Sequence, residues 1–310
     1  SAGSPYQIVD VYGLQGIGSP TLLSSNFVLA NSIDASNTAN WNGGAGFIPI
    51  GNLDNQFNGS LNGQGFSINN LTINSSAAYV GLFGMIGQGG SVQNLGITNI
   101  NLTASGWNGS DDYAHVGALA GFNQGTISNS YATGNIVSFS PADTAPDTGG
   151  LVGTNTGSIS QSYASVNITE HSTGGRLYVG GLVGWNAGGS VSQSYATGTV
   201  TNTSDEFAQV GGLIGQNDGT VDQSYSIGAV NGLGNIGGLI GGNSGTVTSS
   251  YWNTQTSGQS ESDGGAPLTT AQFQSGLPGG FDATAWASGS NLANGYPYLL
   301  WQLPSNAFTV

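Results

Sequence analysis

The chain repeats one short arrangement of apolar and polar residues. The clearest copy reads VGGLVGWN at 179–186 and GSVSQSYATG at 189–198, and in most copies the turn between the two runs reads Asn-x-Gly. The runs are rich in Val, Ile, Thr and Tyr, which favour strands, and none is long enough to be an amphipathic helix. Each copy therefore predicts two strands joined by a turn whose residues accept positive φ.

The copies recur at a regular spacing. Ser-Tyr pairs mark the register, and their tyrosines follow one another at intervals of 32, 32, 30 and 26 residues: Tyr131, Tyr163, Tyr195, Tyr225 and Tyr251. A period of this size is typical of solenoids, in which like residues stack at the strand spacing of roughly 4.8 Å. We predict an all-β fold, a single right-handed parallel β-helix (β-solenoid) with caps at both ends.

The repeats divide the chain into parts of one continuous domain. We assign residues 1–50 to an N-terminal cap and first rung, 51–115 to irregular entry coils, 116–257 to five regular coils, and 258–310 to a C-terminal loop and aromatic cap. Within these parts we expect a short helix at Val11–Ile17 and a helical turn capped by a threonine at 269–273. The aromatic block is expected to lid the C-terminal rung, in preference to forming an exposed binding platform: Trp286, Tyr296, Tyr298, Leu299, Leu300 and Trp301.

Two side-chain directions stay open. In the Gly-Gly-Leu-Val-Gly run, simple alternation puts Leu182 and Val183 on opposite faces although both are apolar. Either this strand is covered on both sides or a bend interrupts the alternation. The repeated tyrosine forms either an inward stack or an outward aromatic ladder.

The repeated residues resemble a known family. The Gly-Leu-apolar-Gly run, the Asn-x-Gly turn and the Ser-Tyr-Ala-Thr-Gly segment look like the GLUG repeat of large secreted bacterial proteins. The segments FNGSLNGQG at 57–65 and YPYLLW at 296–301 resemble parts that flank such repeats in filamentous-haemagglutinin-like exoproteins. The resemblance implies a secreted, surface-displayed passenger of the two-partner-secretion kind, and it implies no catalytic residue.

The amino-acid composition limits the classes of partner that the chain can bind. Fifteen carboxylates face one cation, Arg176, and the net charge is −14, which disfavours nucleic acid and anionic lipid. Cysteine is absent, so disulfides and thiolate metal sites are excluded. No stretch approaches the length of a membrane span, so we expect no membrane insertion, and the lack of a signal peptide predicts a mature or excised fragment.

Most length differences between copies fall between the Ser-Tyr strand and the next Gly-Gly-Leu run. These inserts should emerge along one edge of the solenoid, where binding surfaces commonly form. They collect acids and aromatics, the side chains of glycan-binding or glycan-cleaving grooves. The candidate ligand-binding residues are Trp107, Asp112, Tyr113, His115, Phe139, His171, Arg176, Tyr178 and Phe207. The acids that would serve a catalytic site are Asp111, Asp143, Asp205 and Glu206. Plain solvated loops are the alternative reading.

Metal and glycan attachment sites are weaker candidates. Asp111, Asp112, Asp205 and Glu206 offer oxygen ligands to calcium, but without an EF-hand spacing, and we expect no other cofactor. Among the Asn-x-Ser/Thr sequons, Asn108 and Asn202 fall in predicted loops and are the preferred glycosylation candidates.

The sequence thus predicts an extracellular, non-enzymatic adhesin or structural segment. It would bind a host or environmental glycan or a surface protein through the insert face, or it would act as a spacer. Self-association into filaments is a third possibility, because the chain has almost no Lys or Arg to prevent its sheet edges from pairing with another copy. The rival hypothesis is a polysaccharide hydrolase or lyase, which requires two insert carboxylates about 5–10 Å apart across a cleft.

Overall fold

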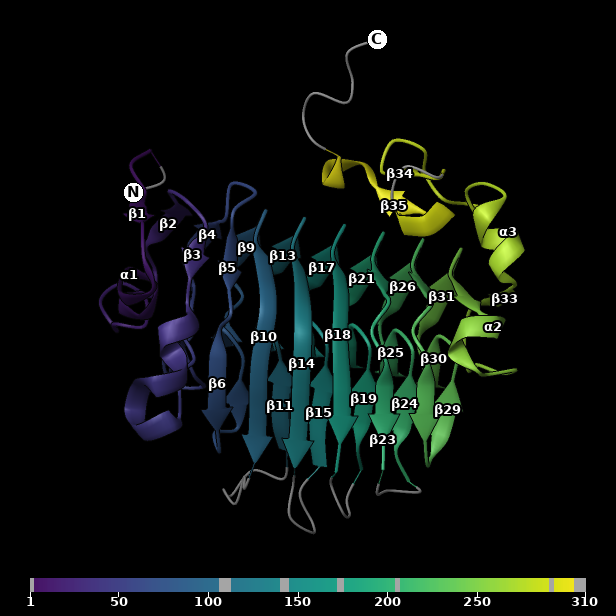
Figure 1. Ribbon diagram of the computed structural model, residues 1–310, viewed down its shortest axis with the longest axis horizontal. Helices are drawn as coiled ribbons and strands as arrows, with labels where there is room; N and C mark the ends of the chain where they lie inside the picture. The colour runs from purple at the N-terminus through teal and green to yellow at the C-terminus, as the bar shows by residue number, and fades with distance from the viewer. Residues whose placement is uncertain are drawn as a thin grey trace.

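A computed structural model of the chain describes residues 3–105, 113–139, 145–171, 176–203, 207–289 and 293–303. Over these ranges the chain winds into a parallel β-solenoid whose coils advance from the N-terminal to the C-terminal end (Figure 1). A regular coil passes in turn through four sheets, which we call D, C, A and B. The predicted all-β solenoid is therefore confirmed.

Sheets D and C form one side of each regular coil. Sheet D contains β7 (Tyr79–Val80), β11 (Tyr113–Gly117), β15 (Ala145–Gly149), β19 (Tyr178–Gly180), β24 (Gln209–Gly211) and β29 (Asn235–Gly237). Sheet C contains β8 (Phe83–Ile86), β12 (Ala120–Asn123), β16 (Val152–Asn155), β20 (Val183–Asn186), β25 (Ile214–Asn217) and β30 (Ile240–Asn243).

Sheets A and B complete the coil and extend further toward the N-terminus. Sheet A contains β1 (Tyr6–Ile8), β2 (Asn26–Leu29), β4 (Ser60–Asn62), β9 (Ser91–Gln93), β13 (Thr126–Ser128), β17 (Ser158–Ser160), β21 (Ser190–Ser192), β26 (Thr220–Asp222) and β31 (Thr246–Thr248). Sheet B contains β3 (Ile33–Asp34), β5 (Ser67–Asn69), β6 (Thr72–Ser75), β10 (Gly96–Ser105), β14 (Tyr131–Phe139), β18 (Tyr163–Glu170), β22 (Tyr195–Ala196), β23 (Val200–Asn202), β27 (Tyr225–Ser226), β28 (Val230–Gly232), β32 (Tyr251–Asn253) and β33 (Ala266–Leu268).

The core is a column of aliphatic side chains inside the coils. In sheet A, for example, Ile127, Ile159, Val191 and Val221 stack in register and are almost fully buried. The question about Leu182 and Val183 is answered by a bend. The chain turns between sheets D and C at Gly181, so both side chains enter the core. A Cβ atom on Gly181 would lie 2.1 Å from the carbonyl oxygen of Gly212 in the next coil, so a larger residue there would require the backbone to shift.

Two ladders of polar side chains hold the corners on either side of sheet A. After sheet C, Asn123, Asn155, Asn186, Asn217 and Asn243 form a column in which each amide donates to the next side-chain oxygen at 2.8–2.9 Å. After sheet A, the serine of each Ser-Tyr pair donates to a backbone carbonyl in its own coil. Its hydroxyl also accepts from a backbone N–H of the preceding coil, as Ser162 does from Ser130 at 3.2 Å. These ladders satisfy buried backbone groups at turns that the sheets leave unpaired.

The repeated tyrosine points outward. Two residues before each tyrosine stands a residue in the left-handed region, such as Gln161 at φ 46°, which resets the alternation at this corner. Tyr131, Tyr163, Tyr195 and Tyr225, the tyrosine ladder, stack with centroids 4.8–5.0 Å apart and planes within 8°. The outward ladder is therefore the correct alternative.

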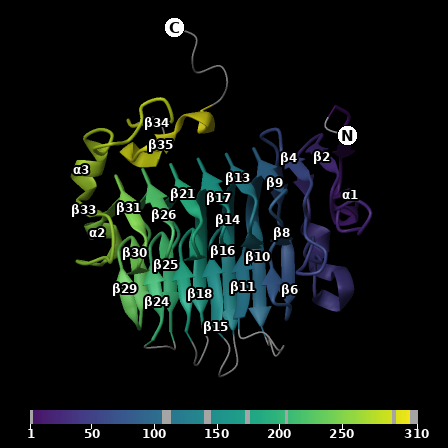
Figure 2. The same cartoon turned by 180° about the vertical axis from the view of Figure 1, so that it is seen from behind.

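The C-terminal aromatic block does not lid the last rung, contrary to our expectation. Residues 269–289 and 293–303, the C-terminal strap, fold back along the side of the solenoid over the tyrosine ladder (Figures 1 and 2). The strap contains α3 (Thr270–Gln274), η2 (Ala293–Gly295), η3 (Leu300–Gln302) and the antiparallel pair β34 (Trp286–Ala287) and β35 (Tyr298–Leu299). The ladder offers an apolar strip along several coils, and the strap buries it in a second hydrophobic cluster.

The ends of the solenoid are covered by other segments. The last rung is met by the loop that follows α2 (Thr254–Ser257), where Glu261 accepts from the Gly238 N–H and Ser262 contacts the backbone of Ile240. At the N-terminal end lie α1 (Val11–Gly16), close to the predicted helix, and the 3-10 segment η1 (Ser36–Gly44). The predicted capped turn is confirmed as α3, whose Thr269 forms a capping box with Gln272.

Candidate functional site

A groove of about 700 Å³ lies between the tyrosine ladder and the C-terminal strap. We call it the ladder groove. Its floor is the outer face of sheet B, where three of the ladder tyrosines are followed, two residues later, by a small polar residue, Thr133, Ser165 or Thr197, and Tyr225 is followed by Ile227. Its far wall is formed by Tyr296, Tyr298, Trp301 and Gln302 of the strap. The groove therefore crosses several coils along the axis of the solenoid.

Three hydrogen bonds fix the strap against the ladder. The Trp301 indole N–H donates to the carbonyl oxygen of Gln161 at 2.9 Å, and the Gln302 amide donates to the Tyr195 hydroxyl at 2.8 Å. The Tyr225 hydroxyl donates to the carbonyl oxygen of Pro297 at 2.5 Å. Trp301 also packs against the rings of Tyr131 and Tyr163, with centroids 6.2 and 6.1 Å away. The walls of the groove are thus held in place before any ligand arrives.

Burial changes the acidity of the ladder. Desolvation raises the pKa of the Tyr131, Tyr163, Tyr195 and Tyr225 hydroxyls above the ordinary tyrosine value of 10.0. For Tyr163 and Tyr195 the neighbouring phenol adds to the rise, while a hydrogen bond with Gln302 opposes it. The groove therefore presents neutral phenols at physiological pH.

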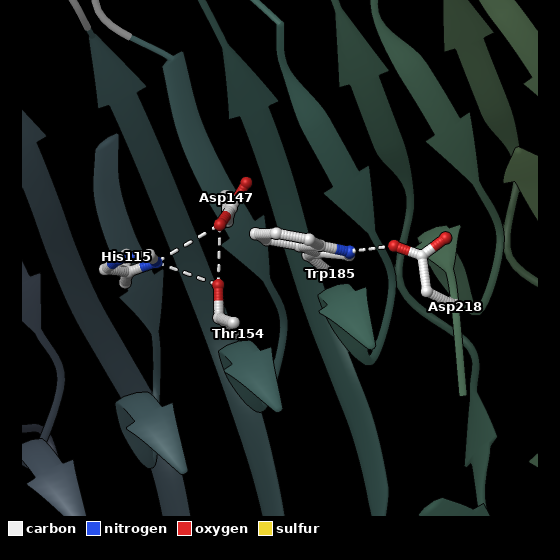
Figure 3. Close-up of polar contacts among 5 residues, drawn as sticks. All are labelled: His115, Asp147, Thr154, Trp185 and Asp218. Atoms are coloured by element: carbon white, nitrogen blue, oxygen red, sulfur yellow. Dashed lines mark hydrogen bonds and ion pairs between the residues drawn. The ribbon is translucent and has the colours of Figure 1, made fainter. Parts of the chain in front are cut away.

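A second candidate is a buried polar cluster at the corner between sheets D and C (Figure 3). The Asp147 carboxylate is fully buried; its Oδ2 lies 3.1 Å from His115 Nδ1 and accepts from the Thr154 hydroxyl at 2.6 Å. Thr154 Oγ1 also lies 2.8 Å from the same His115 nitrogen. In the same view, the Trp185 indole N–H donates to Asp218 at 2.7 Å.

The geometry of this cluster differs from a nucleophilic triad. In a triad the hydroxyl and the acid bind different nitrogens of the imidazole, whereas here both contact Nδ1. Thr154 is 1% exposed, so its hydroxyl is closed to a substrate. The cluster therefore links the column of sheet D that contains His115 and Asp147 to the column of sheet C that contains Thr154. One buried atom, Asp147 Oδ1, has no hydrogen-bond partner among the described residues.

The predicted site residues lie in different parts of the structure, and several fall outside the described ranges. His115 and Tyr178 are buried at the D–C corner, and these two residues do not belong to an insert surface. Arg176 lies over the Tyr178 ring, with 5.6 Å between its Cζ atom and the ring centroid. Phe139 and His171 do lie beside the inserts, with rings stacked at 4.9 Å. Phe207 is 81% exposed and Tyr113 begins β11. The remaining candidates fall outside the described residues: Trp107, Asn108, Asp111, Asp112, Asp143, Asp205 and Glu206.

Asn202 was predicted to be a glycosylation site in a loop, and this is wrong. Asn202 ends strand β23, its side chain is fully buried, and its amide donates to the carbonyl oxygen of Leu233 at 2.9 Å. An enzyme cannot reach this amide in the folded protein.

The described ranges contain no cluster of three or more His, Asp or Glu side chains placed to hold a metal ion. The four calcium candidates lie outside them, so the calcium hypothesis is untested. None of the helices in the described ranges has the length and apolarity that spanning a membrane requires.

The sequence identified His115 as a candidate but predicted neither the ladder groove nor the arrangement of the D–C cluster. The polar row of the groove could be found two residues after Tyr131, Tyr163 and Tyr195, but its function depends on the strap, which lies far away in the chain. Thr154 and His115 are 39 residues apart and are joined by the stacking of two coils. No local motif marks them.

Comparison with protein-family models finds the GLUG motif at residues 112–137, 145–169 and 175–201. Each match spans one coil, from its sheet D strand to its sheet B strand. Halomucin of Haloquadratum walsbyi is 40% identical over 141 residues, and a "Putative Gly-rich membrane protein" of Evansella cellulosilytica is 44% identical over 88 residues. These matches cover 44% and 28% of this chain, and the chain spans 2% and 10% of the relatives.

Two solved structures share the fold. A "putative immunoglobulin A1 protease" from Bacteroides ovatus superposes with a TM-score of 0.69 and 18% identity, over 97% of this chain and 94% of the other. A second structure, "IgA1 Protease", has a TM-score of 0.54 and 19% identity over 80% of this chain and 19% of the other. At this identity the likeness shows the fold alone. The chain therefore carries GLUG-motif repeats, each of the three matched motifs forming one coil of a parallel β-solenoid.

Proposed function

We propose that this chain is a non-enzymatic, extracellular structural and binding segment of a longer surface or secreted protein. The solenoid acts as a rigid support that holds the inserts between sheets B and D in a row for contact with a carbohydrate or protein. Relatives named as a halomucin and a membrane protein support a place at or outside the cell surface. Adhesion and two-partner secretion are finer parts of the same proposal.

The proposal rests on the contacts between successive coils at the edge of the solenoid where the inserts begin. We call this edge the rim. Phe139 at the end of β14 stacks on His171, which directly follows β18. The Nδ1 atom of His171 lies 2.8 Å from the hydroxyl of Thr203 in the next coil. The described ends of three successive inserts are therefore fixed side by side at one edge of the solenoid, the lower edge in Figure 1. A fixed spacing between these described ends favours a repeated or extended partner surface.

A test is provided by the short connection that the chain already contains. Leu233–Gly234 joins β28 of sheet B to β29 of sheet D, within the described fold. By register, Gly232 corresponds to Ser138 and Glu170, and Asn235 corresponds to Asp147 and Tyr178. We replace residues 139–146 and 171–177 by Leu-Gly and assay the parent and the variant on a glycan array and on surface-protein arrays. A variant carrying the same number of substitutions among exposed sheet A residues is the control.

If the inserts form the binding surface, we expect the parent and the control to bind, and the variant with short connections to bind at least tenfold more weakly. Equal binding by both variants would place the contact elsewhere and overturn insert display. Release of cleaved glycan, abolished in Asp111→Asn or Asp143→Asn, would instead support the hydrolase or lyase hypothesis. A single high-mass species in light scattering would favour the filament.

A further inference from the structure

The ladder groove lies away from the insert rim, at the other end of the same strands. Tyr131 begins β14 and lines the groove, whereas Phe139 ends β14 and lies at the rim. In Figure 1 the strap lies above the upper ends of these strands and the rim lies at their lower ends. A ligand of the groove would therefore bind independently of the inserts.

The chemistry of the groove is neutral and mixed. Aromatic rings supply its apolar contacts, and the hydroxyls of Thr133, Ser165 and Thr197 and the amide of Gln302 supply donors and acceptors. None of the described residues that line it is charged. A sugar chain needs this combination, because its rings present apolar C–H faces and its hydroxyls both donate and accept.

The groove also has the repeat of an extended polymer. The ladder rings are spaced 4.8–5.0 Å apart, and the hydroxyls of Thr133, Ser165 and Thr197 follow one another at one residue per coil. An extended β-1,4-linked chain advances by a similar distance per sugar. Successive sugars lying along the solenoid axis would therefore meet equivalent hydroxyls and ring edges in successive coils.

A second hollow of about 360 Å³ extends the groove toward the N-terminus. It shares Gly65, Tyr131 and Trp301 with the first, and it is lined by the side-chain amides of Asn62, Asn94 and Asn129. The ladder ends here, because the position before Tyr131 in the column is Gly96, and a Cβ atom there would lie 2.6 Å from the Tyr131 ring. This hollow replaces aromatic edges by amides, which suits a polar end of the ligand.

Peptides and anionic glycans fit less well. The backbone groups of sheet B are paired between coils, so the floor of the groove offers no strand edge to a peptide. An anionic polymer would meet a chain of net charge −14 with no cation lining the groove among the described residues. The occupant that these observations favour is a neutral sugar chain.

We propose that the ladder groove binds a neutral, extended oligosaccharide laid along the solenoid axis between the tyrosine ladder and the C-terminal strap. Ser165, exposed at the middle of the floor, contacts the sugar hydroxyls, and Trp301 closes the groove over the chain.

The test is titration of the whole chain with cellotetraose, chitotetraose, tetragalacturonate and a neutral Ser/Thr/Gly hexapeptide. Binding is followed by calorimetry and by tryptophan fluorescence, in which the contribution of Trp301, one of six tryptophans, is identified by comparison with Trp301→Phe. We expect at least one neutral tetrasaccharide to bind with a Kd of about 1 mM or tighter, and the anionic sugar and the peptide to bind at least tenfold more weakly. No saturable binding of either neutral tetrasaccharide, or tighter binding of the anion or the peptide, would overturn the proposal.

Variants on one strand face locate the site. Ser165→Tyr fills the middle of the groove and should weaken binding at least tenfold, and Ser165→Ala should weaken it about fivefold by removing one hydrogen bond. Asn167→Tyr is the control, because Asn167 is exposed two residues further along β18 and does not line the groove. It should leave the Kd unchanged. If Ser165→Tyr and Ser165→Ala both leave it unchanged, the sugar binds elsewhere and the proposal fails.

Discussion

Side chains at the corners connect neighbouring coils through hydrogen bonds. The asparagine ladder shows how: Asn186 is fully buried, donates to Asn217 at 2.8 Å and accepts from Asn155 at 2.9 Å. A buried amide that loses its partner costs more than an average hydrogen bond contributes, since no water replaces the partner. The Asn-x-Gly turn of the sequence is therefore a stacking device as well as a turn.

This role predicts the effect of a single substitution. Asn186→Ala should lower the free energy of unfolding by about 2 kcal/mol, because it leaves polar groups of two neighbouring coils without partners. Asn167→Ala is the matched control, since Asn167 is exposed and its hydrogen bonds with Asn135 and with the Thr199 N–H lie where water can replace the lost partner; it should cost about 0.5 kcal/mol or less. Urea unfolding measures both. Equal losses would show that the buried ladder contributes no more than a surface pair.

At the scale of elements, the C-terminal strap is the part that the sequence described least well. Its aromatic residues predict a large apolar surface to be buried, but the same residues suit the end of a rung or its side. The choice depends on the direction of the repeated tyrosines, and the left-handed residue before each one hides that direction from any period-two pattern. Strand identity, turns and the short helices could be predicted because they depend on neighbouring residues.

The junction of strap and ladder predicts a dependence on alkaline pH. Burial raises the pKa of the ladder phenols in the folded protein, whereas in the unfolded chain they ionise near 10.0. Stability is therefore fully present below about pH 10 and falls as pH rises above it, by about 1.4 kcal/mol per pH unit for each phenol that stays neutral only when folded. Urea unfolding between pH 8 and pH 11, followed by tryptophan fluorescence, measures this.

Tyr195→Phe isolates one phenol of the ladder. This variant keeps the ring stack and removes one ionisation, so its stability should fall less steeply above pH 10 than that of the parent, by about 1.4 kcal/mol per pH unit. Tyr12→Phe is the control, because Tyr12 is 67% exposed at the N-terminal end. Identical slopes for the parent and Tyr195→Phe would mean that the strap does not keep this phenol neutral.

At the scale of the molecule, stability comes from contacts between neighbouring coils. Each regular coil pairs with the coils before and after it through all four sheets, as β16 does with β12 and β20. Such a chain behaves as a one-dimensional stack, so its energy is close to a sum over coils and their interfaces. The period could therefore be read from the sequence and led directly to the fold. The groove could not, because it requires the strap to cross coils that the period alone describes as equivalent.

A one-dimensional stack makes an unusual prediction about deletions. Removing residues 150–180 joins Gly149 to Gly181, and because Gly149 pairs with Gly180 and Val152 with Val183, the next coil enters in register. The tyrosine ladder stays continuous, since Tyr195 takes the place of Tyr163. We expect a folded protein with a somewhat smaller unfolding free energy and a urea m-value lower by about a tenth, in proportion to its length.

The smaller deletion of residues 150–162 should do far more damage. It removes β16 and β17 and joins sheet D directly to Tyr163 of sheet B, so the coil cannot close and the strands on both sides lose partners. Unpaired strands and an opened core leave buried backbone groups unsatisfied. Circular dichroism and urea unfolding should therefore show a cooperative β-protein for the longer deletion and loss of cooperativity for the shorter one. If damage instead followed the number of residues removed, stability would not reside in whole coils.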